Sequence, residues 1–408
     1  MAKIKYRNND PQVGIEYDWD LVRDELCKLG IPADYYNPAT APLEVAQWFV
    51  EISERATGKT TGWLLLGAVL HWLYGSVTIY LRSTRDQIAP KNASSLFNVI
   101  LDNGYISKLT NGEYNHVTYR SRKWYFCKID DGGNETLAPN YFCRVVSIDE
   151  GSNLKSSFNE PTGDLIIFDE FIPIDNRYQR PNEFVQLVDV ISTIFRLRET
   201  GKIVLLANNI DRDNQYFNDL EISDIIYPME TGQKTTYITD RGTKIYIEFI
   251  GSPQVYRKRK LKWVKLFAGF GKKELASVTG EDTWSVKMYQ HIPDVPPEDV
   301  EFIEPLCYIY HNHKYIRLDI VRLKDVGLCF FAHMATKTRK NSIILTRVPI
   351  YEPNHYRDLG PKNLERSITK FIKAGRIYFS ANNVGSLFEK YLNECGVVTD
   401  RALRFMHD

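Results

Sequence analysis

The hydrophobic pattern of the first half of the chain predicts a mostly parallel β-sheet covered by helices. Short runs that are apolar at almost every position occur at residues 48–52, 77–81, 165–168 and 203–207, and helical stretches separate them. Strands that are apolar on both faces are typical of a parallel sheet buried on both sides, and the helical stretches provide the crossovers that parallel order requires. The predicted fold class is therefore α/β.

Helical periodicity and one aromatic segment complete this half. A helix is predicted at residues 19–29, and a second at residues 182–198 carries an apolar stripe that is expected to stop at Gly201. Between residues 111 and 149, aromatic and β-branched positions surround an Asp-Asp-Gly-Gly-Asn turn at 130–134. This pattern predicts an antiparallel excursion.

The second half predicts a smaller α/β domain. Runs at residues 306–310, 315–320 and 327–332 are typical of strands, and helical stretches follow at 363–373 and 384–395.

Composition and charge exclude several classes of protein. A hydrophobic content of 43% and a charged content of 25% are ordinary for a globular protein. Because 52 basic residues face 51 acidic ones, nucleic acid could be contacted only by local patches. The six cysteines show no zinc-ligand spacing, which favours reduced thiols in a cytosolic protein. A polar start and broken apolar runs predict neither a signal peptide nor a membrane span.

Residues 53–60, with the sequence Ser-Glu-Arg-Ala-Thr-Gly-Lys-Thr, look like a phosphate-binding loop between a strand and a helix. Phosphate oxygens require backbone N–H groups at a helix N-terminus and a lysine, and Mg²⁺ requires a hydroxyl oxygen. Ser53, Gly58, Lys59 and Thr60 are therefore predicted to bind ATP, although Ser53 stands where the usual pattern has glycine. A chance Gly-Lys-Thr in a strand-helix turn is the alternative.

Two acidic residues and one amide follow neighbouring apolar strands. Asp169 and Glu170 end the run at 165–168, and Asn208 ends the run at 203–207. With a phosphate loop upstream, Asp169 is predicted to bind Mg²⁺ together with Thr60, and Glu170 to polarise the attacking water. Without that loop, two acids that cap a turn would explain the pair equally well. Asn208 either senses the γ-phosphate or caps the next turn.

This set of motifs resembles a family of viral DNA-packaging motors, the large terminases, whose deviant phosphate loop contains an arginine. The closer resemblance is to the packaging ATPases of small podoviruses of the phi-29 type, and it covers most of residues 35–220. It is carried by an ordered series of motifs: Ser53, Arg55 and Gly58-Lys59-Thr60, Tyr36-Asn37-Pro38, Ile79–Arg82, Phe168–Ile172, Pro181–Glu183, Phe195–Arg198 and Leu206–Asn208.

The resemblance implies a P-loop NTPase domain of the ASCE class. In that family Lys59 and Thr60 would bind phosphate and Mg²⁺, Arg55 would belong to the loop, and Asp169 and Glu170 would form the hydrolytic pair. The expected parts of the chain are an N-terminal leader (1–45), a P-loop ATPase domain (46–227), a linker or lid subdomain (228–285) and a smaller C-terminal domain (286–408).

The resemblance also implies basic residues at the boundary between subunits. Arg196 is a candidate arginine finger that enters the neighbouring subunit's site and stabilises charge in the transition state. A solvated helix end favoured by the helix dipole is the alternative for Arg196. Arg85 and Lys155 align with basic positions of the family near that boundary, which makes them candidate nucleotide-binding residues.

The family's second domain has an RNase H-like fold, and this domain lacks the metal-binding acids in the phi-29 type. Asp319 lies in a strand-like segment here without partner acids on neighbouring strands. A vestigial nuclease domain without nuclease activity is therefore expected.

The implied function is an ATP-driven motor that translocates double-stranded viral DNA into a procapsid. The expected partners are the DNA, the portal or connector of the procapsid, and identical subunits in a homo-oligomeric ring, a pentamer by resemblance. The expected location is the host cytoplasm, transiently on the procapsid, without a membrane. The basic segment 257–265 either faces DNA phosphates or is a solvated linker helix. A helicase- or partition-type ATPase and a non-catalytic nucleotide-binding scaffold are the alternatives, and Glu170 argues against the scaffold.

Overall fold

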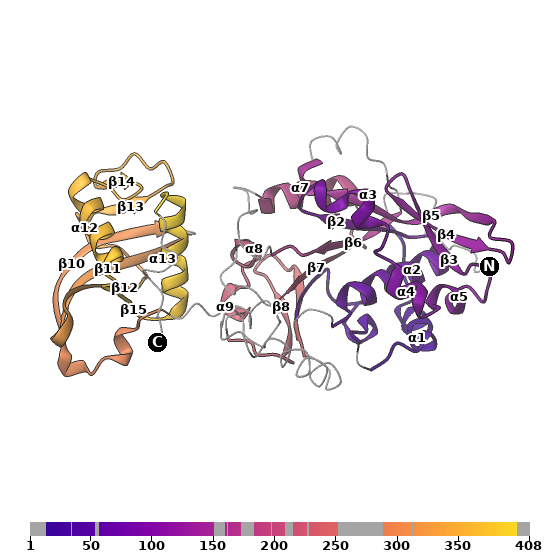
Figure 1. Cartoon of the computed structure of the whole chain (residues 1–408), viewed down its shortest axis with the longest axis horizontal. Helices are drawn as coiled ribbons and strands as arrows, with labels where there is room; N and C mark the ends of the chain where they lie inside the picture. The colour runs from indigo at the N-terminus through magenta and orange to yellow at the C-terminus, as the bar shows by residue number, and fades with distance from the viewer. Residues whose placement is uncertain are drawn as a thin grey trace. The chain divides into compact units, whose positions relative to one another are not determined.

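The computed structural model describes residues 14–33, 35–53, 57–150, 160, 162–172, 183–196, 198–208, 215–226, 228–251, 289–311 and 313–397. The chain forms two compact units, Met1–Arg212 with Asp219–Trp284 and Asp213–Asn218 with Ser285–Asp408. Figure 1 labels most of the helices and strands of each unit.

The first unit is built on a nine-stranded sheet with the order β3-β4-β5-β2-β6-β7-β1-β9-β8. Neighbouring strands from β5 to β9 in this order run parallel. At the two ends of the sheet, β3 and β4 on one side and β8 on the other pair antiparallel with their neighbours. The predicted mostly parallel α/β sheet and the antiparallel excursion are thus confirmed. The strands are β1 (Trp48–Ser53), β2 (Val77–Arg82), β3 (His116–Arg120), β4 (Lys123–Ile129), β5 (Glu135–Ser147), β6 (Gly163–Asp169), β7 (Lys202–Asn208), β8 (Lys234–Ile238) and β9 (Lys244–Ile250).

Strands β8 and β9 lie in the segment that the sequence analysis assigns to a linker subdomain. They extend the large sheet, because β9 pairs directly with β1 along the whole length of that strand. Residues 252–288, which contain the basic segment 257–265, lie outside the described residues.

The described helices of residues 14–251 are α1 (Trp19–Leu29), α2 (Lys59–Tyr74), α3 (Pro90–Ala93), α4 (Asn98–Asp102), α5 (Tyr105–Leu109), α7 (Glu183–Phe195), α8 (Gln215–Asp219) and α9 (Ser223–Ile226). The predicted helix at 19–29 is confirmed as α1. Asp18 caps it by accepting a hydrogen bond from the backbone N–H of Leu21, and Gly30 ends it with a φ of 68°.

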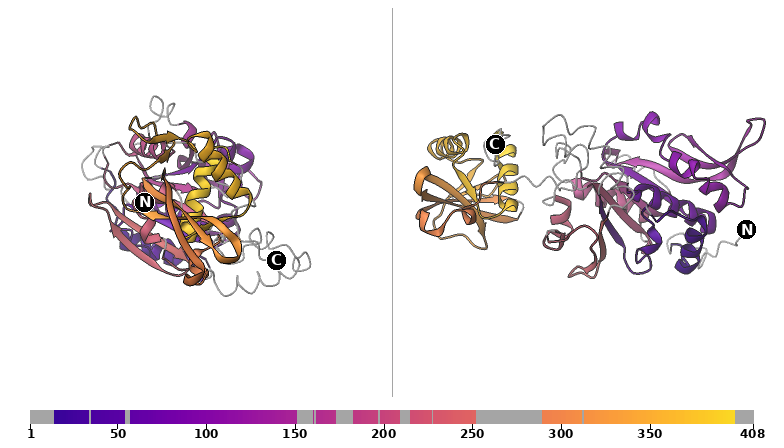
Figure 2. Two further views of the ribbon diagram at one scale, coloured as in Figure 1. Left: turned by 90° about the vertical axis from the view of Figure 1, so that its left-hand side faces the viewer. Right: turned by 60° about the horizontal axis from the view of Figure 1, so that its bottom comes forward.

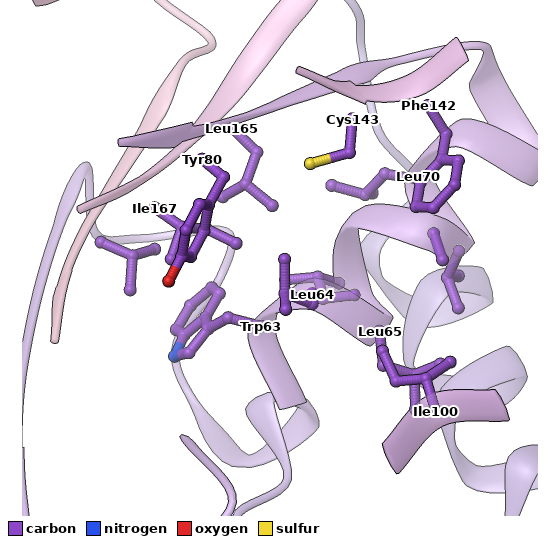
Figure 3. Close-up of a cluster of buried hydrophobic side chains, with 14 of the residues drawn as sticks. Trp63, Leu64, Leu65, Leu70, Tyr80, Ile100, Phe142, Cys143, Leu165 and Ile167 are labelled. Carbon is purple, nitrogen blue, oxygen red and sulfur yellow. The ribbon is translucent and has the colours of Figure 1, made fainter. Parts of the chain in front are cut away.

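Helix α2 is buried on nearly all sides, because it is apolar around its circumference from Gly62 to Leu70. Figure 3 shows Trp63 and Leu64 on the side of the helix next to Tyr80 and Ile167 of the sheet, within one hydrophobic core. Burial of each leucine contributes about 2 kcal/mol. Packing therefore holds the first turn of α2 at a fixed place against the sheet.

Helix α7 ends earlier than its apolar stripe suggests. The predicted helix reaches residue 198, but α7 ends at Phe195 because Arg196 adopts a left-handed φ of 54°. The predicted stop at Gly201 has a packing role instead. A Cβ atom on Gly201 would lie 2.5 Å from the ring of Phe195, so the chain after the helix folds closely against its last residue.

The second unit contains a six-stranded sheet with the order β14-β13-β10-β11-β12-β15. Strands β10, β11 and β12 form an antiparallel meander, and parallel pairs join the others. Helices α12 and α13 share one hydrophobic core with this sheet. Figure 2 shows the ribbon of this unit in orange to yellow. The RNase H-like classification stays a prediction. The elements are β10 (Val300–His311), β11 (Lys314–Leu323), β12 (Gly327–Ala335), β13 (Ile344–Thr346), β14 (His355–Arg357), α12 (Lys362–Lys373), β15 (Ile377–Phe379) and α13 (Asn382–Glu394).

Among the described residues, none of the helices combines the length and the apolar character that a membrane crossing requires.

Candidate active site

Four strands of the large sheet end in polar residues at the same edge. The carboxyl ends of β1, β7, β6 and β2 carry Ser53, Asn208, Asp169 and Arg82. Ser53 and Asn208 are direct partners in the pairing of β1 with β7, and β7 alone separates β1 from the acidic strand β6. This is the strand order of an ASCE P-loop domain, in which the phosphate loop and the acids face one another across the edge. Open α/β sheets bind ligands at this edge.

Gly58 forms the bend that leads from the phosphate loop into α2. Its φ of 85° is left-handed, and a Cβ atom there would lie 2.5 Å from the ring of Tyr35. Only glycine meets both conditions. The backbone N–H of Tyr36 donates to the carbonyl of Thr57 at 2.9 Å, so the segment before β1 is fastened to the loop. Arg55 lies outside the described residues.

Lys59 is buried and directed at the sheet edge. Its Nζ donates hydrogen bonds to Ser53 Oγ and to Asn208 Oδ1, both at 3.0 Å. Ser53 Oγ also lies 2.7 Å from Thr57 Oγ1. Serine at the first position of the loop therefore has a local function, since its hydroxyl accepts a hydrogen bond from the lysine. The structure brings Ser53, Lys59 and Asn208 together, as the motifs predict.

Thr60 and Asp169 meet across the same edge. Thr60 Oγ1 donates to Asp169 Oδ2 at 3.2 Å, and the hydroxyl of Tyr80 donates to the same oxygen at 2.8 Å. Hydroxyl and carboxylate oxygens are the ligands that Mg²⁺ prefers, and this ion usually takes one or two protein oxygens together with phosphate and water. The pair fits such an ion. Among the described residues no group of three or more His, Cys, Asp or Glu side chains forms a metal site.

Glu170 follows Asp169 in a strained backbone conformation. Its φ of 53° is left-handed, and its side chain is 52% exposed. The guanidinium of Arg82 donates to the Glu170 carboxylate and lies 3.7 Å from Asp169 Oδ2. Burial alone would lower the pKa of Arg82, but Tyr80, Asp169 and Glu170 raise it. Arg82 therefore stays charged between two acids.

Sequence reasoning assigned no site role to Tyr80 or Arg82. Both belong to the Ile79–Arg82 motif at the carboxyl end of β2. The sequence feature that could have indicated a site role is their place at the end of an apolar strand, because polar residues there lie at the edge of the sheet where ligands bind. It becomes specific only once β2 is known to lie beside β6.

A buried carboxyl group lies below the phosphate loop. Glu51 of β1 has no exposed surface, and it accepts hydrogen bonds from the hydroxyl of Tyr36 and, at 2.7 Å, from Nε1 of Trp63. Burial raises the pKa of Glu51 to about 8, hydrogen bonds from Tyr36 and Trp63 oppose the rise, and the nearby charge of Glu248 adds to it. Alternating side chains place Glu51 on the same face of β1 as Ser53.

A pocket opens beside the first turn of α2. Its walls combine three tyrosine rings with aliphatic side chains and one amide. The lining residues are Ile31, Tyr35, Tyr36, Gly58, Thr61, Gly62, Leu65, Val99, Asn103 and Tyr105. Aromatic walls and a few polar groups are typical of pockets that bind flat organic rings.

Two of the three predicted basic residues, Arg85 and Arg196, belong to the described part of the chain. Arg85 has its own partners, since its Nε lies 3.3 Å from Glu150 and its backbone N–H donates to Asp149. Lys155 lies outside the described residues. Arg196 is exposed and follows α7, whose chain runs from the carboxyl edge back to the amino edge of the sheet.

The distance from Arg196 to the acids of the same subunit follows from β6. The guanidinium of Arg198 donates to the carbonyl of Gly163 at 2.8 Å, which fixes this part of the chain at the first residue of β6. Asp164 and Asp169 are five residues apart on this strand, or about 16 Å at the usual rise per residue. One side chain at the amino edge does not span that distance, so Arg196 is not part of the acid cluster of its own subunit.

Asp319 of the second unit has basic partners. Its carboxylate accepts from Arg317 Nε at 2.7 Å and lies 2.9 Å from His333 Nε2. The side chain is buried in β11. An aspartate held by two basic groups is structurally satisfied, and the absence of nuclease activity stays a prediction.

Comparison with known proteins yields one family. Residues 34–227 match the family described as "Podovirus DNA encapsidation protein (Gp16)". A segment of 53 residues is 45% identical to the "DNA packaging protein" of Bacillus phage B103. That match covers 13% of this chain and 16% of the relative, so it spans well under two thirds of the relative's length.

Two solved structures share the fold over most of the chain. "The bacteriophage Phi-29 viral genome packaging motor assembly" has a TM-score of 0.61 at 16% identity, covering 89% of this chain and 100% of that one. "The Phi-28 gp11 DNA packaging Motor" has a TM-score of 0.54 at 14% identity, covering 92% and 100%. At these identities the matches establish a common fold.

Proposed function

We propose, because residues 34–227 match the podovirus DNA encapsidation protein (Gp16) family, that the chain is an ATP-driven motor that moves double-stranded viral DNA into a procapsid. The observation that carries the proposal is the meeting of Lys59, Thr60, Asp169 and Glu170 at one edge of a single sheet. Subunits act as a homo-oligomeric ring on the portal in the host cytoplasm.

In this proposal the site binds the triphosphate of ATP at the start of α2. The backbone N–H groups of the loop and the Nζ of Lys59 contact phosphate oxygens. Thr60 and Asp169 supply oxygen ligands to Mg²⁺, which neutralises phosphate charge when bound. The base occupies the pocket between Tyr35 and Tyr105.

Hydrolysis requires a water in line with the γ-phosphate. Glu170 orients this water and accepts its proton while the bond between the γ-phosphorus and the bridging oxygen breaks and ADP leaves. Arg82 offsets the combined negative charge of Glu170 and Asp169, which otherwise repel the triphosphate. Asn208, already hydrogen-bonded to Lys59, is placed to sense the γ-phosphate.

Arg196 acts on the neighbouring subunit. Support comes from its exposure and from its position at the opposite sheet edge from Asp169. A guanidinium that enters the next subunit's site stabilises charge on the transferred phosphoryl group, an effect typically of about 10³- to 10⁵-fold in rate. Hydrolysis then depends on ring assembly, and DNA in the ring couples to it.

The first experiment measures ATP turnover with and without duplex DNA for the parent protein and for Glu170→Gln. We expect turnover stimulated by DNA in the parent and lost in the variant, while ATP binding persists because the glutamine keeps the shape of the site. Absence of turnover in the parent would favour a nucleotide-binding scaffold. Binding of the parent to portal-containing procapsids, compared with procapsids that lack the portal, separates packaging from helicase-type action.

The second experiment tests action between subunits. Lys59→Ala and Arg196→Ala proteins are each expected to keep only a small residual turnover alone. Mixed rings should regain part of the turnover, because a Lys59→Ala subunit still offers Arg196 to a neighbour with an intact loop. No recovery in assembled mixed rings would contradict the assignment of Arg196.

A further inference from the structure

A buried ion pair lies behind Arg196. Arg198 and Asp164 have side chains that are 3% and 0% exposed, and Arg198 Nε lies 3.0 Å from Asp164 Oδ1. The guanidinium of Arg198 also donates to the carbonyls of Glu160, Gly163 and Ile194, at 2.8 to 3.2 Å. One side chain thereby joins the last turn of α7 to the start of β6.

This junction fixes the chain around Arg196 on both sides. Arg196 keeps a helical hydrogen bond from its N–H to the carbonyl of Ser192 at 2.8 Å, yet its φ of 54° is left-handed. Arginine is disfavoured at such a position, where glycine is usual. A strained residue persists only when its surroundings over-determine it, and strain of this kind is concentrated at functional sites. The buried Arg198–Asp164 pair supplies that constraint.

The N-terminal segment contacts the same carboxylate. Asp164 Oδ2 accepts from the backbone N–H of Ile15 at 3.2 Å, from the hydroxyl of Tyr17 at 3.4 Å and from Thr200 Oγ1 at 3.0 Å. Gly14 is packed so closely that a Cβ atom there would lie 2.1 Å from Thr200 Oγ1. Residues 14–17 therefore pack against Thr200, in the segment that follows Arg196, and share its hydrogen-bond acceptor Asp164.

We propose that the Arg198–Asp164 pair, held by residues 14–17, is a positioning device for Arg196 that sets how this arginine enters the neighbouring subunit's site. The inference rests on the proposed function, since it requires Arg196 to act between subunits. The role of Asp164 is indirect, because its carboxylate lies about 16 Å along β6 from Asp169. The N-terminal segment of one subunit thereby affects hydrolysis in the next.

The test is a double-mutant cycle on the full chain, with DNA-stimulated turnover as the readout. Asp164→Asn keeps the shape of the side chain and removes its charge. We expect kcat to fall about tenfold or more, as for other small misplacements of catalytic groups, while the KM for ATP changes less than about twofold. In an Arg196→Ala background the same substitution should change kcat by less than about twofold, because the two residues act as one unit.

Mixed rings give a second readout that a merely structural role would not move. Asp164→Asn subunits retain an intact phosphate loop, so mixing them with Lys59→Ala subunits should restore turnover to the extent seen with Arg196→Ala. Ile100→Ala, a core substitution on α4 away from the α7–β6 junction, is the matched control. It should lower the melting temperature without changing kcat, and should not be rescued by mixing.

The outcomes separate the two proposals. If Arg196→Ala and Lys59→Ala rings recover but Asp164→Asn lowers kcat equally in both backgrounds, the positioning role is wrong and the motor mechanism stands. If no mixture recovers, action between subunits is wrong and the inference falls with it. Should Asp164→Asn fail to fold, Tyr17→Phe removes a single donor to Asp164 and undergoes the same cycle, with an expected loss of about threefold.

Discussion

Replacing Glu51 with glutamine is expected to change the pH dependence of stability. Glu51 is fully buried in β1, where burial raises the pKa of its carboxyl group from 4.5 to about 8, against the opposing hydrogen bonds from Tyr36 and Trp63. A proton on this carboxyl has an acceptor available, since the hydroxyl of Tyr36 both donates and accepts. The folded protein therefore holds a proton on Glu51 at neutral pH.

The sign and the size follow from the two pKa values. Because folding raises the pKa of Glu51, the stabilisation by its proton is fully present below pH 4.5 and is lost as the pH rises through 8. Each pH unit between these values costs about 1.4 kcal/mol. Between pH 5.5 and 7.5 this one group lowers the free energy of unfolding by about 2.5 kcal/mol. Glutamine does not titrate, so Glu51→Gln should gain that amount relative to the parent over the same interval.

The assay is urea unfolding followed by circular dichroism at pH 5.5, 6.5 and 7.5, with the slope against urea compared between proteins. Other groups titrate in this interval, and subtracting the parent from the variant cancels them. Glu248→Gln is the matched control, because Glu248 pairs with Glu51 across β1 and β9. It should retain most of the pH dependence. A difference between Glu51→Gln and parent that stays constant with pH would refute a protonated Glu51.

Three further predictions concern the site and its frame. Gly58→Ala should abolish ATP binding in a titration while the protein still melts cooperatively, because the added Cβ meets Tyr35 at 2.5 Å and φ is 85°. Tyr80→Phe should lower the free energy of unfolding by about 1 kcal/mol and raise the Mg²⁺ concentration needed for half-maximal turnover, since Asp169 loses a buried donor; unchanged values would show that water replaces the hydroxyl. Arg196→Gly should melt higher than Arg196→Ala, by about 1 kcal/mol, because only glycine relaxes a φ of 54°; equal melting would show that the backbone there is unstrained.

Much of the sheet and of the site was predictable because both depend on short sequence patterns. Apolar runs gave the strands that carry Ser53, Asp169 and Asn208 to within two residues, since a parallel strand buried on both faces is apolar throughout. The edge at which these residues meet follows from parallel order alone. The site therefore needed only the correct strands and the residues that follow them.

The remainder depends on contacts between distant segments, which no local pattern contains. The neighbours of β6 had to be known before Arg82 could be placed beside Glu170. Likewise, only the pairing of β9 with β1 shows that the charge of Glu248 helps to raise the pKa of Glu51. The end of α7 was missed for a similar reason. Its apolar stripe continues in the sequence, but the burial of Arg198 against β6 turns the chain at Arg196.

Strand β6 relates the two strained residues of the proposed mechanism. Glu170 and Arg196 have φ values of 53° and 54°, and they lie at opposite edges of the sheet. Strand β6 is connected to both residues. Asp164, the second residue of β6, forms the ion pair with Arg198 that supports Arg196, and Asp169, the last residue of β6, directly precedes Glu170. The strand is buried throughout and hydrogen-bonded on both sides, to β2 and β7, so its length is fixed. One rigid strand therefore sets the distance between the ion pair that supports Arg196 and the acids of the same subunit's site.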